Sequence, residues 1–389
     1  MHSGEVKRAL FSTFPGPTDL FLMNRVSRSD FLRLLGAGVA AASLGVAHGA
    51  PRGESKRVRI KPIKGSWISI WWDDRRHFYW NDACLNYTAK QWELGVREVA
   101  EIGMEYLVLL AIGKDSKAFY DTPLLPKLKM ACPNPIEALL AAADKCHVKF
   151  FLSSDWFGPW DYQCLRDPAR VRARLQMMGE IAQQYGHHRS FYGWYWPNEA
   201  ALTPYFTEDF ISYVNACSHE ARQLMPRAKT LIAPYGTRQA VCDDRFVRQL
   251  EQLDADIVAY QDEVGCLRMD AAQSAAAFET LRRAHDRVPQ RALWADVEVF
   301  AWEGPPNNPG SPLIPAPFAR VKQQLAAVSP FVDTILIYQY QGLMNKLGTQ
   351  AFAGHPNSTW LYTDYVNWLK ENSRSILRSP KTTGPVPFL

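Results

Sequence analysis

The chain has 389 residues, of which 47% are hydrophobic and 12% aromatic, so it can bury a large core, and a single α/β barrel with insertions reaches this size. Its formal net charge of +5 is concentrated in residues 1–57, which hold 8 Lys and Arg against 4 Asp and Glu, and the remainder is nearly neutral with 36 against 35. A near-neutral body with no basic cluster beyond Arg59 to Lys64 disfavours nucleic acid as a partner.

Residues 1–50 are typical of an N-terminal extension that carries an export signal. Basic residues precede an apolar run, Leu34 to Ala47, of about fourteen residues, which is too short for a stable membrane span. The basic residues before this run are Arg25, Arg28 and Arg33. The segment around them is similar to a twin-arginine signal with Ser29 in place of the second arginine, and a Sec route stays open. We expect Met23 as the initiator and a periplasmic or secreted protein, the alternative being a buried Ala/Gly-rich helix.

After a linker at 51–64, strand-like runs alternate with amphipathic helical patterns eight times. The predicted strands are Trp67–Trp72, Tyr106–Ile112, Val148–Ser153, Phe191–Trp196, Thr230–Pro234, Ile257–Gln261, Ala292–Val297 and Thr334–Tyr338. The predicted helices are Thr88–Ile102, Pro135–Cys146, Pro168–Tyr185, Glu208–Met225, Asp244–Leu253, Ala271–Arg287, Pro317–Val328 and Thr359–Glu371. This alternation indicates a parallel sheet with helices as the crossovers.

The pattern favours a closed barrel over an open sheet. Runs such as Tyr106 to Leu110 are apolar throughout, as expected of parallel strands that are buried on both faces. A doubly wound sheet is the main competitor, but it usually has a glycine-rich turn after its first strand, and here that turn is Trp71 to Asp74. We therefore predict an α/β fold, a single-domain (β/α)8 TIM barrel over residues 65–372, with a C-terminal tail at 373–389.

Acidic and aromatic side chains follow the predicted strands, where a barrel of this kind places its active site. Flat sugar rings stack on Trp and Tyr, and sugar hydroxyls bind Asp, Asn and Gln, so this mixture predicts a carbohydrate site. The alternative is that the tryptophans only cap the barrel. The candidate substrate contacts are Trp71, Trp72, Asp73, Asp155, Trp156, Trp196, Asn198, Tyr260, Gln261, Asp262, Glu263, Asp296, Trp302, Tyr338 and Tyr340.

Two glutamates are the candidate catalytic residues. Cleavage of a glycosidic bond needs one carboxyl group to protonate the leaving oxygen and another to attack the anomeric carbon or activate water. Glu199 and Glu298 follow the predicted fourth and seventh strands, and a separation of about 5 Å would give retention of configuration, whereas about 6.5–9.5 Å would give inversion. Asp262 or Glu263 could supply either carboxylate instead.

The motif Trp-Tyr-Trp-Pro-Asn-Glu-Ala, which contains Asn198 and Glu199, and the motif Trp-Ala-Asp-Val-Glu-Val-Phe, which contains Glu298, resemble the large clan of retaining glycoside hydrolases built on (β/α)8 barrels. The resemblance implies Glu199 as acid/base and Glu298 as nucleophile, with Asn198 on a substrate hydroxyl. Residues 259–265, Ala-Tyr-Gln-Asp-Glu-Val-Gly, are more closely similar to a bacterial barrel family catalogued as a domain of unknown function and provisionally placed among glycosidases.

The sequence lacks the motifs that would indicate a metal site or an esterase. CxxC, HxH and HExxH spacings are lacking, so no metal or cofactor is predicted, and we interpret His187-His188 as a helix-end pair. The sequence also lacks the GxSxG motif that is typical of esterases. We therefore predict an exported retaining glycoside hydrolase with a carbohydrate substrate, the alternative being a non-catalytic carbohydrate-binding or polysaccharide-assembly barrel. The sequence leaves the sugar and the oligomeric state open.

Overall fold

The computed structural model describes residues 59–72, 75–114, 116–154, 165–199, 201–305 and 311–378. The predicted export signal, most of the predicted linker and the last residues of the predicted tail lie outside these ranges. Three predicted substrate contacts, Asp73, Asp155 and Trp156, also lie outside them. Within the described ranges, no helix combines the length and the apolar character that crossing a membrane requires.

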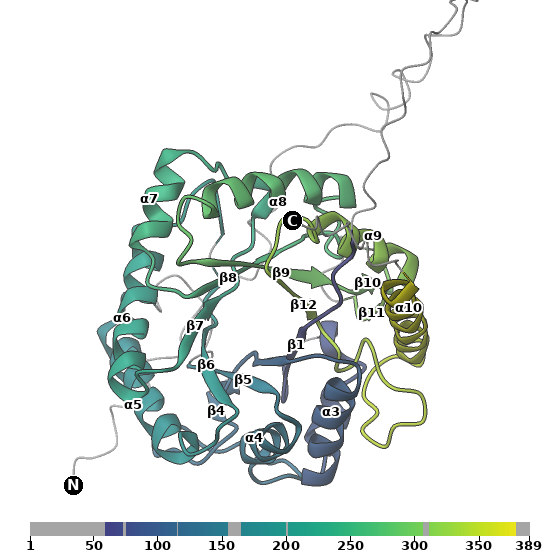
Figure 1. Cartoon of the computed structure of the whole chain (residues 1–389). Coiled ribbons are helices and arrows are strands. Elements are labelled where there is room, and N and C mark those ends of the chain that lie inside the picture. Colours follow the sequence, from purple (N-terminus) through teal and green to yellow (C-terminus); the bar gives the residue numbers. More distant parts are fainter. Residues whose placement is uncertain are drawn as a thin grey trace, which may run out of the picture. The chain divides into compact units, whose positions relative to one another are not determined.

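Eight parallel strands close into a barrel, which confirms the predicted fold (Figure 1). The strands are β1 (Gly65–Ile68), β2 (Tyr106–Leu109), β5 (Lys149–Ser153), β6 (Phe191–Trp196), β7 (Lys229–Ile232), β8 (Ile257–Gln261), β9 (Ala292–Glu298) and β12 (Thr334–Tyr338). Each strand pairs with its neighbours in chain order, and β1 closes the ring by pairing with both β2 and β12. The predicted strand count is therefore correct, so β6 is the fourth barrel strand and β9 the seventh.

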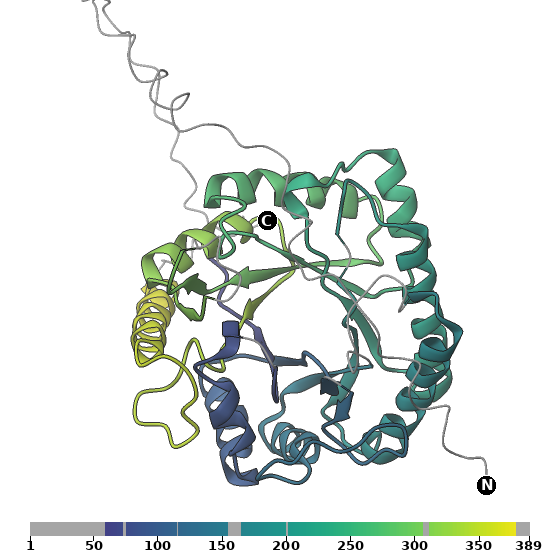
Figure 2. The ribbon, with the colours of Figure 1, turned by 180° about the vertical axis from the view of Figure 1, so that it is seen from behind.

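Helices form a ring outside the strands (Figures 1 and 2). They are α3 (Ala89–Glu101), α4 (Pro135–Cys146), α5 (Pro168–Tyr185), α6 (Glu208–Leu224), α7 (Asp244–Gln252), α8 (Ala271–His285), α9 (Phe318–Val328) and α10 (Ser358–Arg378). Their starts follow from local chemistry, because Thr88 and Asp270 make capping boxes and Asn134 and Asp167 cap helices whose first residue is proline.

Short elements follow several strands and build the rim of the barrel. They are η1 (Arg75–His77), α2 (Asn81–Leu85), the strand pair β3 (Gly113–Lys114) and β4 (Lys117–Ala118), η3 (Thr237–Gln239), and the strand pair β10 (Phe300–Trp302) and β11 (Leu313–Pro315). The β10–β11 hairpin comes directly after β9, the strand that carries Glu298. The sequence did not predict these rim elements, since each is too short for its periodicity to be recognised.

Segments on both sides of the barrel strands extend the contacts of the barrel. The backbone N–H groups of Lys61, Ile63 and Lys64 donate to Ser329, Tyr365 and Ile335, respectively. At the other end of the described chain, α10 continues to Arg378.

The inside of the barrel is filled by large aromatic side chains. Trp67 on β1 and Tyr195 on β6 meet edge to face with their ring centroids 4.6 Å apart, and Phe151 and Trp294 belong to the same buried cluster. Space for such rings exists because Gly193 on β6 has no side chain. A Cβ at that position would lie 2.4 Å from the Lys229 carbonyl oxygen and 2.6 Å from the Phe151 ring.

We predict that Gly193→Ala lowers the free energy of unfolding by about 1–3 kcal/mol, because the methyl group forces Phe151 or the β7 backbone to move. The matched control is Gly95→Ala on α3, where no atom lies within 4 Å of the added Cβ. In this control the better helix propensity of alanine should raise the free energy of unfolding by about 0.5–1 kcal/mol. Urea denaturation of both variants checks this, and an equal effect of the two substitutions would contradict the packing argument.

Candidate active site

A cavity of about 640 Å³ is lined by side chains from the carboxyl ends of the strands and the rim elements. Eight predicted site residues line it: Trp72, Glu199, Gln261, Glu263, Asp296, Glu298, Trp302 and Tyr338. The carboxyl ends of the barrel strands therefore surround a cavity. It draws on β8, β9 and β12 as well as on loops after β1, β2, β6 and β7.

Six other predicted contacts do not line the cavity, although the structure describes them: Trp71, Trp196, Asn198, Tyr260, Asp262 and Tyr340. Trp196 and Tyr260 are buried in the layer between strands and helices, where Trp196 Nε1 donates to Ser218 Oγ and the Tyr260 hydroxyl lies 2.9 Å from His285 Nε2. Alternate residues of a strand point to opposite faces, and these two point outward to α6 and α8.

The other residues in this group are also withdrawn from the cavity. Tyr340 is buried with its ring 6.2 Å from that of Tyr362 on α10, and Trp71 is half-buried against the outer hydrophobic core. Asn198 directly precedes Glu199, is buried and does not line the cavity.

Glu298 is the last residue of β9, and its carboxylate is held by the segment after β8. Oε2 accepts a hydrogen bond of 2.7 Å from the backbone N–H of Cys266. The neighbouring Gly265 allows this close approach, because a Cβ there would lie 2.6 Å from Glu298 Cβ. The carboxylate is therefore fixed by backbone rather than by a flexible side chain.

Asp262 is fully buried and connects β8, β9 and α9. Its Oδ1 accepts from the backbone N–H of Glu298 at 3.0 Å, and its Oδ2 accepts from Gln324 Nε2 at 2.8 Å. Gln324 and Arg320 on α9 also donate to the Glu298 carbonyl oxygen, at 3.0 and 2.9 Å. Asp262 thus positions the backbone of Glu298 and presents no oxygen to the cavity.

Glu263 follows Asp262, and its carboxylate likewise accepts hydrogen bonds from backbone N–H groups. Its Oε1 accepts from the Gly236 N–H at 2.6 Å and its Oε2 from the Arg238 N–H at 3.2 Å, with the Arg268 guanidinium 3.9 Å away. These contacts hold the turn that begins η3. Both of the alternative carboxylates considered from sequence are therefore engaged with backbone amides.

Glu199 follows β6, which β7 and β8 separate from β9 in the barrel, and it lines the same cavity as Glu298. Burial raises its pKa to about 7, although a hydrogen bond from Gln261 and the charge of Arg76 both act to lower it. A carboxyl group with this pKa is partly protonated at neutral pH, which is the state a general acid needs.

The acidic groups in and beneath the cavity influence one another. Burial raises the pKa of Asp296, and the charges of Glu298, Asp262 and Glu199 raise it further. Burial and the Asp262 charge also raise the pKa of Glu298, against the hydrogen bonds from Cys266. Asp296 thus lies near carboxyl groups that follow β6 and β8 and near Glu298 at the end of β9.

The walls of the cavity carry aromatic and basic side chains. The Lys114 ammonium group lies 4.6 Å from the centre of the Trp72 ring, and His77 Nε2 lies 2.7 Å from the Tyr338 hydroxyl. The sequence did not predict ten of the lining residues: Trp67, Arg76, His77, Leu110, Lys114, Tyr235, Cys266, Arg268, Phe300 and Leu313. Arg76, Lys114 and Arg268 make the mouth less acidic than the strand ends alone indicate.

Solved structures with a similar fold carry glycosidase names. A protein of Bacteroides thetaiotaomicron, provisionally named an alpha-L-fucosidase, has a TM-score of 0.63 and 18% identity over 86% of this chain and 99% of that one. A beta-galactosidase from the Antarctic haloarchaeon Halorubrum lacusprofundi has a TM-score of 0.51 and 12% identity over 80% of this chain and 58% of that one. A beta-galactosidase from the psychrophilic Marinomonas ef1 has a TM-score of 0.52 and 11% identity over 80% and 60%. At these identities the likeness shows the fold alone.

Sequence comparison identifies the family. No curated protein matches the sequence. Residues 63–350, which include every barrel strand and all the cavity residues described above, match the model of a family described as a domain of unknown function, DUF4434. The chain belongs to the DUF4434 family.

Proposed function

We propose that this protein is an exported retaining glycoside hydrolase that acts on an oligo- or polysaccharide. One observation carries the proposal: Glu199 and Glu298, which follow the fourth and seventh strands of the barrel, line the same cavity. The glycosidase names of the similar structures support the assignment. Export rests on the basic and apolar pattern of residues 1–50.

In this proposal each glutamate has one role. Glu199, with its raised pKa, donates a proton to the glycosidic oxygen while Glu298 attacks the anomeric carbon, so the glycosidic bond breaks and a glycosyl ester forms. Since Oε2 of Glu298 is engaged by Cys266, Oε1 is the attacking atom. The Glu199 carboxylate then takes a proton from water, whose oxygen attacks the anomeric carbon and releases Glu298.

The cavity walls suit a sugar ring. Trp72 and Trp302 offer aromatic surface on which the C–H faces of a pyranose can stack, and Gln261 and Asp296 offer hydrogen-bonding groups for hydroxyls. Asp296 Oδ1 has no hydrogen-bond partner among the described residues. Because Arg76, Lys114 and Arg268 also face this space, the substrate panel should include uronides beside neutral glycosides.

We predict that Glu298→Gln abolishes turnover on a panel of aryl glycosides that includes alpha-L-fucosides, beta-D-galactosides and glucuronides, because no covalent intermediate can form. In Glu199→Gln, turnover of substrates with poor leaving groups should fall by about 10²–10⁴-fold, whereas turnover of activated aryl glycosides should fall far less. Release of the aryl group and of reducing sugar measures both. A 2-deoxy-2-fluoro glycoside should increase the mass of the wild type by one glycosyl unit and leave Glu298→Gln unlabelled.

The matched control is Glu279→Gln, which neutralises an exposed glutamate on α8 that pairs with Arg283. It should keep wild-type turnover. Full activity of Glu298→Gln would refute the assigned nucleophile. Saturable binding of oligosaccharides without any turnover of the wild type would instead favour the non-catalytic carbohydrate-binding barrel.

We expect a bell-shaped dependence of kcat/KM on pH with an active range near neutrality. Activity should fall above about pH 7, since Glu199 loses its proton there. It should also fall on acidification well above the ordinary glutamate range, since the raised pKa of Glu298 makes it accept a proton early. Initial rates on an activated aryl glycoside should lose the alkaline limb in Glu199→Gln, and an unchanged limb would exclude Glu199 as the acid.

Asp262→Asn separates a positioning role from a catalytic one. Its amide oxygen can still accept from the Glu298 N–H, while loss of the charge removes one cause of the raised Glu298 pKa. We predict measurable turnover with the acid limb moved to lower pH. If Asp262 were one of the two reacting carboxylates, this variant would have no more activity than Glu298→Gln. Circular dichroism checks that the variant is folded.

A further inference from the structure

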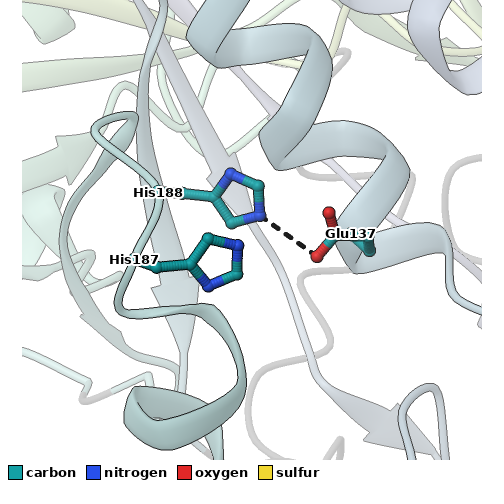
Figure 3. Close-up of side chains that lie close together, drawn as sticks. All are labelled: Glu137, His187 and His188. Carbon is teal, nitrogen blue, oxygen red and sulfur yellow. Dashed lines mark hydrogen bonds and ion pairs between the residues drawn. The ribbon is translucent and has the colours of Figure 1, made fainter.

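Two histidines and a glutamate form a compact cluster that takes no part in the cavity (Figure 3). Glu137 lies in the first turn of α4, and His187 and His188 lie in the turn between α5 and β6. One ligand atom from each of the three lies within 4.8 Å of the other two. In Figure 3 both rings stand side by side on the same side of the chain and face the Glu137 carboxylate.

One pair of atoms in the cluster is close to the spacing of two ligands on a tetrahedral ion. His188 Nε2 and Glu137 Oε2 are 3.1 Å apart. Zinc binds nitrogen and oxygen at about 2.0–2.2 Å, and tetrahedral angles then separate two ligand atoms by roughly 3.3–3.5 Å. The His187 ligand atom lies within 4.8 Å of both, so this ring must move inward to bind the same ion. His187 is exposed, so its ring can turn to complete the set and the site can be reached from solvent.

Asp144 supports His188 in the way that carboxylates support metal-binding histidines. Its Oδ2 lies 2.7 Å from His188 Nδ1, and its Oδ1 accepts from the Ser190 N–H at 2.6 Å. A proton held on Nδ1 by Asp144 leaves the lone pair of Nε2 for a metal and fixes the orientation of the ring. His188 is buried, so this orientation is also enforced by packing.

Charge favours a cation at this point. Two carboxyl groups, Glu137 and Asp144, face His188, and the His187 ring lies tilted against it with 4.1 Å between ring centroids. The carboxyl groups therefore stabilise positive charge on or beside the imidazole, which either a proton or a divalent ion can provide.

We propose that Glu137, His187 and His188 bind one zinc ion, with water in the fourth position. Two imidazoles and one carboxylate are a donor set that suits Zn²⁺. The ion would join the first turn of α4 to the turn before β6, so its role is to stabilise the barrel wall.

Titration calorimetry of the full, tag-free chain with zinc chloride after chelator treatment tests the site. We expect one ion per chain at pH 7.5 and a higher Tm with zinc, because an ion that binds only the folded state stabilises it. His187→Ala and Glu137→Gln should each weaken this binding by about tenfold or more. His219→Ala, which removes an exposed histidine on α6 outside the cluster, should bind as the wild type does.

Two further measurements distinguish this site from a protonated histidine pair. Affinity should fall between pH 7.5 and 6, because His188 must lose its Nε2 proton to bind the metal. Cobalt substituted for zinc should give a visible absorption spectrum that His187→Ala changes and His219→Ala does not. The proposal is overturned if the wild type takes up no zinc at micromolar concentrations, or if zinc binds equally to His187→Ala, Glu137→Gln and the wild type.

Discussion

A single buried carboxylate, that of Asp262, determines how the end of β9 lies in the cavity. Burying a carboxylate is costly unless its oxygens are hydrogen-bonded, and here both are, one by the Glu298 backbone and the other by Gln324. The same contacts bring α9 against the strand end, since Gln324 also donates to the Glu298 carbonyl oxygen. Any shift of Asp262 would move the Glu298 backbone. The location of Glu298 therefore depends on a residue that the cavity does not expose.

The sequence predicted the barrel because its pattern repeats: three strands, Phe191–Trp196, Ile257–Gln261 and Thr334–Tyr338, have the predicted bounds, and the other strand bounds shift by a few residues. The face to which each strand-end side chain points was less predictable. Parallel strands are apolar on both faces, so their sequence does not reveal which alternate residues point inward. Trp196 and Tyr260 accordingly looked like cavity residues and are instead packed against helices.

Residues that approach the cavity from loops carried no signal in the sequence. Arg76 and Lys114 belong to rim elements of two or three residues. Cys266 lies in the segment after β8, three residues beyond Glu263, whose backbone has a positive φ of 53°. Their positions depend on the closure of the ring rather than on local periodicity. The same holds for the cluster of Glu137 and His188, which are far apart in the sequence and meet only because α4 and the turn before β6 are neighbours in the barrel wall.

Crowded carboxyl groups give the cavity a property that no single residue has. Burial raises the pKa values of Glu199, Asp296 and Glu298, and neighbouring carboxylates raise those of Asp296 and Glu298 further. Burial and crowding therefore favour a protonated carboxyl group in the cavity before substrate arrives. A retaining mechanism needs one protonated and one ionised carboxyl group, and this crowding supplies that combination from burial and proximity alone. The two roles are then distinguished by position and not by pKa, since burial raises the pKa of both glutamates, and Glu298 is the one whose carboxylate is held by the Cys266 amide.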